Sequence, residues 1–60
     1  MNAYDNWLAY ALGCTDNQLR VVWEDESNRM KTTPNDEVLV DSMAAMAACS
    51  VVAAQRGMLL

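Results

Sequence analysis

Apolar side chains in the first segment of the chain, residues 2–12, recur at the spacing of one helical face. The i, i+3, i+4, i+7 pattern is followed by four of them, Tyr4, Trp7, Leu8 and Ala11. Asn2 can accept hydrogen bonds from the first free backbone amides, and Gly13 can adopt the left-handed conformation that ends many helices. The pattern therefore predicts a helix over residues 2–12, with the two aromatic side chains packed in a core.

The last long segment, residues 34–56, has the strongest helical pattern. Pro34 suits the first position of a helix, and Asp36 and Glu37 favour the positive end of its dipole. Arg56 favours the opposite end, and Gly57 is a plausible stop. We expect one long helix that begins near Pro34 and ends at about Arg56.

This long helix is apolar over most of its circumference. Its most polar strip on a helical wheel contains Glu37, Asp41, Ala44, Ala48 and Gln55. A surface helix normally shows an apolar stripe only a little over 100° wide. We therefore expect the helix to be buried on several sides, partly by a second copy of the chain. The expected self-association surface consists of Val40, Ala44, Ala47, Ala48, Val51 and Val52.

The middle of the chain, residues 14–33, fits two patterns. Thr15 and Gln18 form a capping-box pair that favours a helix, but such a helix would carry Glu26 on its apolar face. The alternation of apolar and polar side chains from residue 19 to 24 favours a strand, and residues 25–28 resemble a four-residue turn. The hairpin is the preferred interpretation.

These elements predict a single α+β domain over residues 1–60, in the order helix, β-hairpin, long helix. A three-helix all-α bundle is the alternative. A chain of 60 residues buries only about 60% of its unfolded surface, so a small domain usually needs a disulfide, a metal or a partner. Cys14 and Cys49 are expected to be reduced and buried, which leaves self-association as the source of extra stability.

The composition argues against catalysis. The chain has no His and only two glycines, so the most common general base and a phosphate-binding loop are both missing. No spacing of Cys, Asp or Glu matches a zinc or calcium site, and no cofactor is expected. A net charge of −4 argues against direct binding to nucleic acid. The N-terminus lacks a secretory pattern, and the uncharged stretch of residues 42–54 is short for a membrane span, so a cytoplasmic protein is expected.

The acidic residues suggest a protein-binding function. An acidic surface could occupy a basic groove of a nucleic-acid-processing complex as an inhibitor or decoy. The expected surface consists of Glu24, Asp25, Glu26, Asp36, Glu37 and Asp41. In size and charge alone, the chain is similar to small acidic phage-encoded inhibitors, including anti-CRISPR proteins. The alternative is a structural or adaptor subunit that uses the apolar C-terminal helix as its interface.

Overall fold

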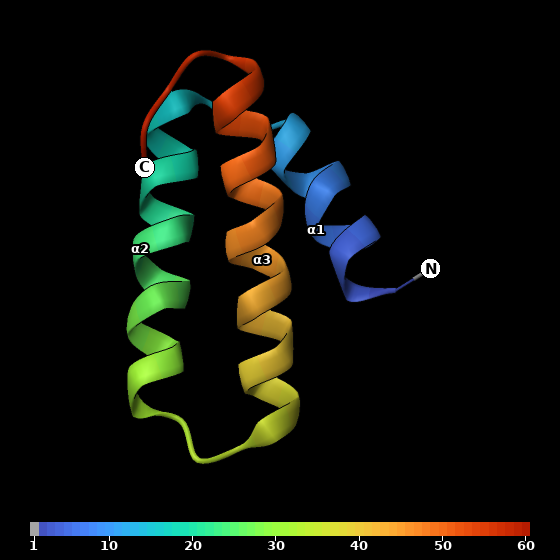
Figure 1. The fold of residues 1–60 in the computed structure, drawn as a ribbon, viewed down its shortest axis with the longest axis vertical. Coiled ribbons are helices and arrows are strands. Elements are labelled where there is room, and N and C mark those ends of the chain that lie inside the picture. Colours follow the sequence, from blue (N-terminus) through green and yellow to red (C-terminus); the bar gives the residue numbers. More distant parts are fainter. Residues whose placement is uncertain (1) are drawn as a thin grey trace.

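The computed structural model describes residues 2–60, and these residues form three α-helices without any strand. Helix α1 spans Ala3–Leu12, α2 spans Asp16–Thr32 and α3 spans Asp36–Gln55. α2 and α3 lie antiparallel to each other, and α1 lies on the other side of α3 (Figure 1). The predicted α+β fold with a hairpin is therefore wrong, and the domain has the all-helical architecture of the alternative.

Local hydrogen bonds explain why the middle of the chain is helical. The backbone amide of Thr15 donates to Gln18 Oε1 at 2.7 Å, and the amide of Gln18 donates to Thr15 Oγ1 at 3.2 Å. This capping box satisfies two amides that the first turn of α2 leaves free. At the other end, Arg29 and Lys31 lie in the last turn, where positive charge favours the helix dipole. The residues expected to form a turn, 25–28, lie inside α2.

Glu26 was the main objection to a helix here, and the structure gives it a buried partner. Ser42 Oγ on α3 donates a hydrogen bond to Glu26 Oε2 at 2.7 Å, while Arg29 lies 3.6 Å from the other carboxylate oxygen. Glu26 is only 4% exposed and Ser42 is fully buried. A carboxylate can be buried when it is paired and hydrogen-bonded. The pair fixes the register of α2 against α3.

The helix ends differ in part from the sequence prediction. Asn2 caps α1 as expected, accepting from the amide of Asp5. Gly13 ends α1 in the right-handed region, with φ −88°, so the left-handed stop predicted there is wrong. α3 begins at Asp36 with Asn35 as its cap, and Pro34 precedes the helix instead of opening it. Gly57 does have a positive φ of 75°, as a stop after α3 requires.

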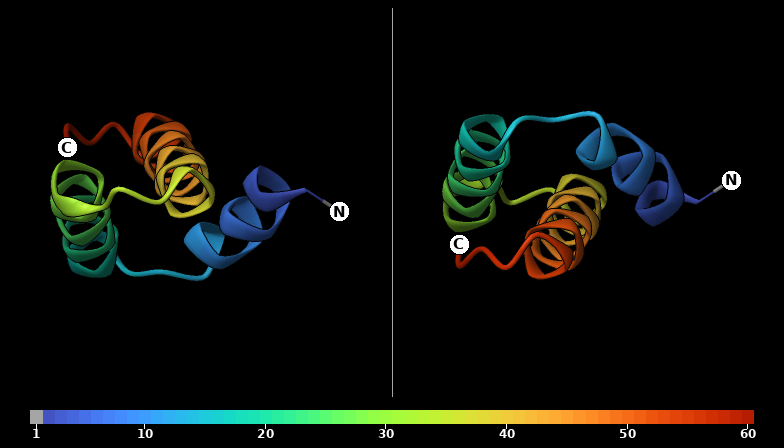
Figure 2. Two further views of the ribbon diagram at one scale, coloured as in Figure 1. Left: turned by 90° about the horizontal axis from the view of Figure 1, so that it is seen from below. Right: turned by 90° about the horizontal axis from the view of Figure 1, so that it is seen from above.

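Helix α3 is the centre of the fold. It packs along both α1 and α2, which have no comparable interface with each other. End-on views show α3 at the apex of a V, with α1 and α2 on its two sides (Figure 2). Buried alanines of α3, Ala45, Ala48 and Ala53, let the helices approach closely. Cys14, Leu19, Cys49 and Val52 join Ala11 in one core cluster, and both cysteines are free.

Candidate functional site

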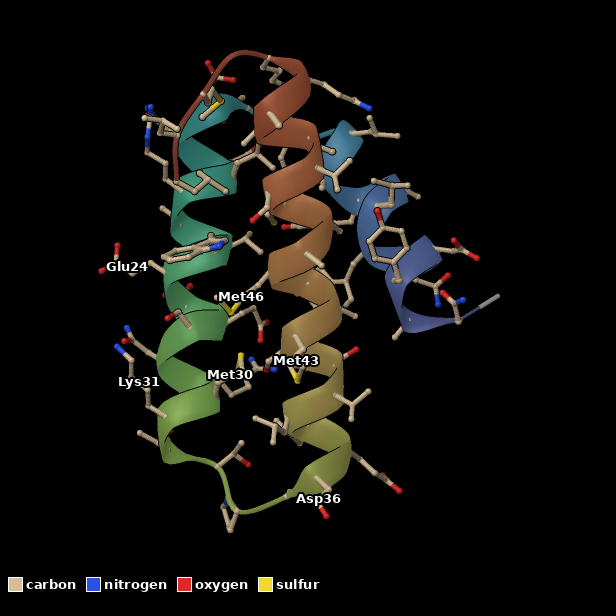
Figure 3. The ribbon with its side chains drawn as sticks, in the orientation of Figure 1. Glu24, Met30, Lys31, Asp36, Met43 and Met46 are labelled. Carbon is tan, nitrogen blue, oxygen red and sulfur yellow. The ribbon has the colours of Figure 1, made fainter. Side chains whose placement is uncertain are left out.

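The most distinctive surface of the domain is the side of α3 that faces away from α1 and α2. We call it the outer face; it consists of Val40, Met43, Ala47, Ser50, Val51 and Ala54, all exposed. Val40 is 62% exposed and Met43 is 53% exposed. Figure 3, which looks onto α3 from the front, shows Met43 on this helix. Apart from the Ser50 hydroxyl, the side chains of this face are apolar.

The position of α3 in the fold explains why this face stays open. α1 and α2 pack on its two flanks and leave the apex of the V uncovered (Figure 2). The buried residues of α3 all lie on the opposite side of its wheel: Ser42, Ala45, Ala48, Cys49, Val52 and Ala53. The helix is therefore half covered by its own chain. Its uncovered side is apolar from Val40 to Ala54 apart from Ser50, and its other exposed polar side chains lie at the two ends of the helix.

The polar strip of α3 is divided: its middle, from Asp41 to Ala48, points toward the fold, whereas Glu37 and Gln55 at its ends are exposed. Asp41 Oδ1 accepts a hydrogen bond from the indole Nε1–H of Trp7 on α1 at 3.0 Å. Ala48 of the same strip is fully buried, and Ala44 is half-buried. This orientation reverses the usual arrangement, in which the polar face of a surface helix meets solvent. α3 uses Asp41 to bind α1 and leaves the apolar outer face exposed.

The residues predicted for self-association are divided between the surface and the core. Val40, Ala47 and Val51 lie on the outer face and are exposed. Ala44 is half-buried. Ala48 and Val52 are buried within the chain's own core, at 0% and 1% exposure, and are unavailable to a partner.

The predicted acidic surface is also divided. Glu24 and Asp25 are exposed on α2, and Asp36 and Glu37 are exposed at the start of α3. Glu26 is buried against Ser42, and Asp41 is bound to Trp7, as described above. Figure 3 shows Glu24 partway along α2 and Asp36 at the foot of α3. The hairpin tip that would have gathered Glu24, Asp25 and Glu26 into a finger does not form.

The surface hollows and the cysteines offer little chemistry. One hollow, of about 450 Å³, is open and is lined by Ala3, Asn6, Trp7, Tyr10 and Asp41. Its one carboxylate already accepts the Trp7 hydrogen bond. Burial raises the pKa of the Cys49 thiol above its ordinary value of 9.0, and nearby Cys14 and Glu26 raise it further. A thiol with a raised pKa is a poor nucleophile at neutral pH. Among residues 2–60, no group of three or more His, Cys, Asp or Glu side chains could hold a metal ion.

By length and composition alone, α3 could cross a membrane. It has 20 residues, and an 18-residue window within it has a mean hydropathy of 1.6, with a third of that window buried in the fold. The prediction of no membrane span rested on the shorter uncharged stretch of residues 42–54. The core helix of a soluble protein meets the same criterion, so the finding is weak evidence for a membrane span.

Comparison with known proteins gives no match to a family model, a curated protein or a solved structure. The function must therefore be inferred from the surfaces of this domain. Sequence reasoning missed the outer face as a unit, although a signal was present. Val40, Met43, Ala47, Ser50 and Ala54 follow the alternating three- and four-residue spacing of a coiled-coil seam.

Proposed function

We propose that this chain is a non-catalytic protein-binding module and that the outer face of α3 docks a helix of a partner polypeptide. One observation carries the proposal: the solvent-facing side of the longest helix is apolar from Val40 to Ala54 except for the Ser50 hydroxyl, while Asp41, the charged residue in this stretch of the helix, is bound inside the fold. Exposed contiguous apolar surface on a small soluble domain commonly marks an interaction site. The seam-like spacing suits a helical partner, because knobs from a second helix fit between residues at these positions.

The energy available on this face is enough for a specific contact. Complete burial of a Val or Met side chain stabilises by about 1.5–3 kcal/mol relative to exposure. Val40 and Met43 still expose more than half of their surface, so each can contribute about 1 kcal/mol on docking. Val51, at 39% exposure, adds a smaller amount. The small side chains of Ala47 and Ala54 let a partner backbone come close, which adds van der Waals contact.

A polypeptide partner has more support than a lipid bilayer. The hydrogen bonds from Trp7 to Asp41 and from Ser42 to Glu26 tie α3 to both neighbouring helices. Inserting α3 into a membrane would break both bonds and would carry Asp41 and Ser42 into hydrocarbon. Unpaired polar and charged groups are costly there. Docking a helix on the outer face leaves both bonds intact.

The acidic-decoy function has less support. Its exposed acids are divided between the outer surface of α2 and the start of α3, and two of the six expected residues are engaged inside the fold. A decoy that competes for a phosphate groove needs a concentrated negative surface. Changing both Glu24 and Asp25 to Lys is expected to leave partner binding unchanged if the outer face of α3 is the interface.

The test compares two matched alanine variants. Ala47→Glu places a charge at the middle of the outer face, and Ala9→Glu places the same charge at an exposed alanine of α1. Each protein is examined for its solution mass by light scattering, for co-purifying proteins from its source cells and for binding to lipid vesicles. Circular dichroism checks that both variants remain helical.

The proposal expects an assembly, or a specific co-purifying protein, that Ala47→Glu abolishes and Ala9→Glu retains. It is overturned if the two variants behave alike in both assays. It is also overturned if the only binding that Ala47→Glu abolishes is binding to vesicles, since the outer face would then serve a bilayer.

A further inference from the structure

We infer that the partner helix on the outer face is α3 of a second copy of the chain, packed antiparallel about a two-fold axis beside Ala47. The inference rests on the proposed function, because it uses the same face and names its occupant. Two features of the outer face support it: where its charge lies and how its bulk is distributed.

The outer face brings no like charges together at its centre. Between residues 38 and 55 the only charged side chain of α3 is Asp41, which points to Trp7 on α1. The acidic end of the helix is its start, where Asp36 and Glu37 are exposed. A surface that binds a copy of itself must be self-complementary, and an uncharged stripe meets this condition without an opposite charge to match.

The position of these two acids selects the antiparallel arrangement. In a parallel pair, Asp36 and Glu37 of both copies would meet at the same end and repel each other. In an antiparallel pair, the two acidic ends are separated by the length of α3, about 30 Å for 20 residues. That distance exceeds the Debye length of about 8 Å at physiological salt, so the repulsion is largely screened.

Arg56, near the other end of α3, does not alter the preference for the antiparallel over the parallel arrangement. Its guanidinium donates to Asp16 Oδ1 at 3.0 Å and to the Leu12 carbonyl at 3.4 Å. It therefore points back to the corner between α1 and α2 and does not project from the outer face. The antiparallel arrangement places the acidic start of α3 beside a partner end whose one cation is already paired.

Side-chain bulk along the face favours the same arrangement. The first half carries the large residues Val40 and Met43, whereas the second half carries mostly small ones, including Ser50 and Ala54. An antiparallel pair centred on Ala47 sets Val40 opposite Ala54 of the other copy and Met43 opposite Val51, so neither Val40 nor Met43 meets its own copy. A parallel pair sets large against large and small against small, which leaves gaps and clashes.

Ala47 at the axis permits a close approach of the two helices. Its side chain is a single methyl group on an exposed position, and it meets its own copy where the helices cross. Two helices with small residues at the crossing point can pack at the short end of the usual range, about 8 Å between axes. Met43, which is flexible, can then adapt to the neighbouring groove.

Cross-linking of single-cysteine variants tests the arrangement. Val40→Cys and Ala54→Cys are made separately, one of them carrying a mass tag, and are treated with a short bismaleimide alone and as a mixture. Within one chain these positions lie about 21 Å apart along the helix, so a short linker cannot join them in one copy. The native thiols of Cys14 and Cys49 are buried, and the unsubstituted protein serves as the control for their reaction. Glu24→Cys, on the exposed side of α2, measures how much cross-linking arises from random collisions between molecules.

The inference expects the mixture to give heterodimer at least about tenfold above either variant alone, because paired thiols in a complex have an effective concentration near the millimolar range. A cross-linked dimer from Val40→Cys alone would mean parallel packing and overturn the arrangement while keeping the proposed function. A monomeric protein that loses a co-purifying partner in Ala47→Glu would overturn the second copy as occupant, again keeping the proposed function. Failure of the Ala47→Glu and Ala9→Glu comparison itself overturns both.

Discussion

The buried pair of Glu26 and Ser42 gives the sharpest prediction about the fold. Ser42→Ala removes the hydroxyl that donates to Glu26 Oε2 at 2.7 Å and leaves a carboxylate that is 4% exposed. The nearest remaining cation, Arg29, lies 3.6 Å from the other oxygen and is itself half in solvent, with 53% of its side chain exposed. The variant should therefore be clearly less stable than the natural chain.

The magnitude follows from the charge on the acceptor. A hydrogen bond to a charged group contributes about 1.5–3 kcal/mol, so we expect Ser42→Ala to lower the free energy of unfolding by about 2 kcal/mol. A domain of this size loses about 4–8 °C of Tm for each kcal/mol, which gives a decrease of about 8–16 °C. The total stability of 60 residues is only about 3–9 kcal/mol, so the variant is expected to be close to unfolding.

A second variant separates the lost bond from a general defect. Replacing both partners, with Glu26→Met and Ser42→Ala together, removes the buried charge as well as its donor. Replacing a buried polar pair with apolar side chains of similar size is often neutral or stabilising. The double variant should therefore recover most of the stability that Ser42→Ala loses. Ser50→Ala, on the exposed side of the same helix, is the matched control and should change stability by less than about 0.5 kcal/mol.

The assay is thermal and urea unfolding followed by circular dichroism, at one protein concentration and with the solution mass of each variant recorded. If Ser42→Ala is no less stable than Ser50→Ala, Glu26 does not meet Ser42 and the register of α2 on α3 is wrong. Additive losses in the double variant would lead to the same conclusion, because independent sites add and coupled sites do not.

Three further predictions concern other parts of the chain. Ala48→Leu should cost about 1–3 kcal/mol by overpacking a fully buried site, whereas Ala47→Leu on the outer face should leave the stability of the monomer nearly unchanged, as urea unfolding would measure. Gly57→Ala should cost about 1–2 kcal/mol, because a residue with φ 75° becomes strained even though the added methyl meets no atom within 4 Å; a shift in Tm of less than 2 °C would contradict it. Because burial raises the pKa of Cys49, the folded state holds the thiol proton more tightly than the unfolded state does. The protonated thiol therefore makes its full contribution to the free energy of unfolding below pH 9.0, and that contribution is lost as the pH rises above this value. Unfolding at a series of alkaline pH values should show this loss, and Cys49→Ala should reduce the dependence.

The sequence by itself determined the two terminal helices, because the signals that define them are local. The i, i+3, i+4, i+7 pattern and the Asn2 cap depend only on neighbours along the chain, and both appear in α1. The long apolar periodicity likewise predicted α3, with its end near Gly57. Errors at the ends were small: Pro34 lies before α3, and Gly13 has ordinary right-handed geometry.

Tertiary structure decided the middle of the chain. The alternation from residue 19 to 24 and the polar run at 25–28 fit a hairpin as long as Glu26 is assumed to need solvent. That assumption fails because Ser42, sixteen residues away in sequence, supplies a buried donor. No local pattern identifies such a partner. The sequence prediction therefore gave the capping box of Thr15 and Gln18 too little weight against the expected cost of burying Glu26, which the hydrogen bond from Ser42 offsets.

Tertiary structure also decided which side of α3 forms the candidate interface. A helix that is apolar nearly all round does not reveal which side its own chain will cover, and the polar strip at Asp41 is a misleading guide to the outer side. Packing of α1 through Trp7 and of α2 through Glu26 turned Asp41 and the Ser42 side inward. The side left over, from Val40 to Ala54, is exposed because two short helices can flank α3 but cannot surround it.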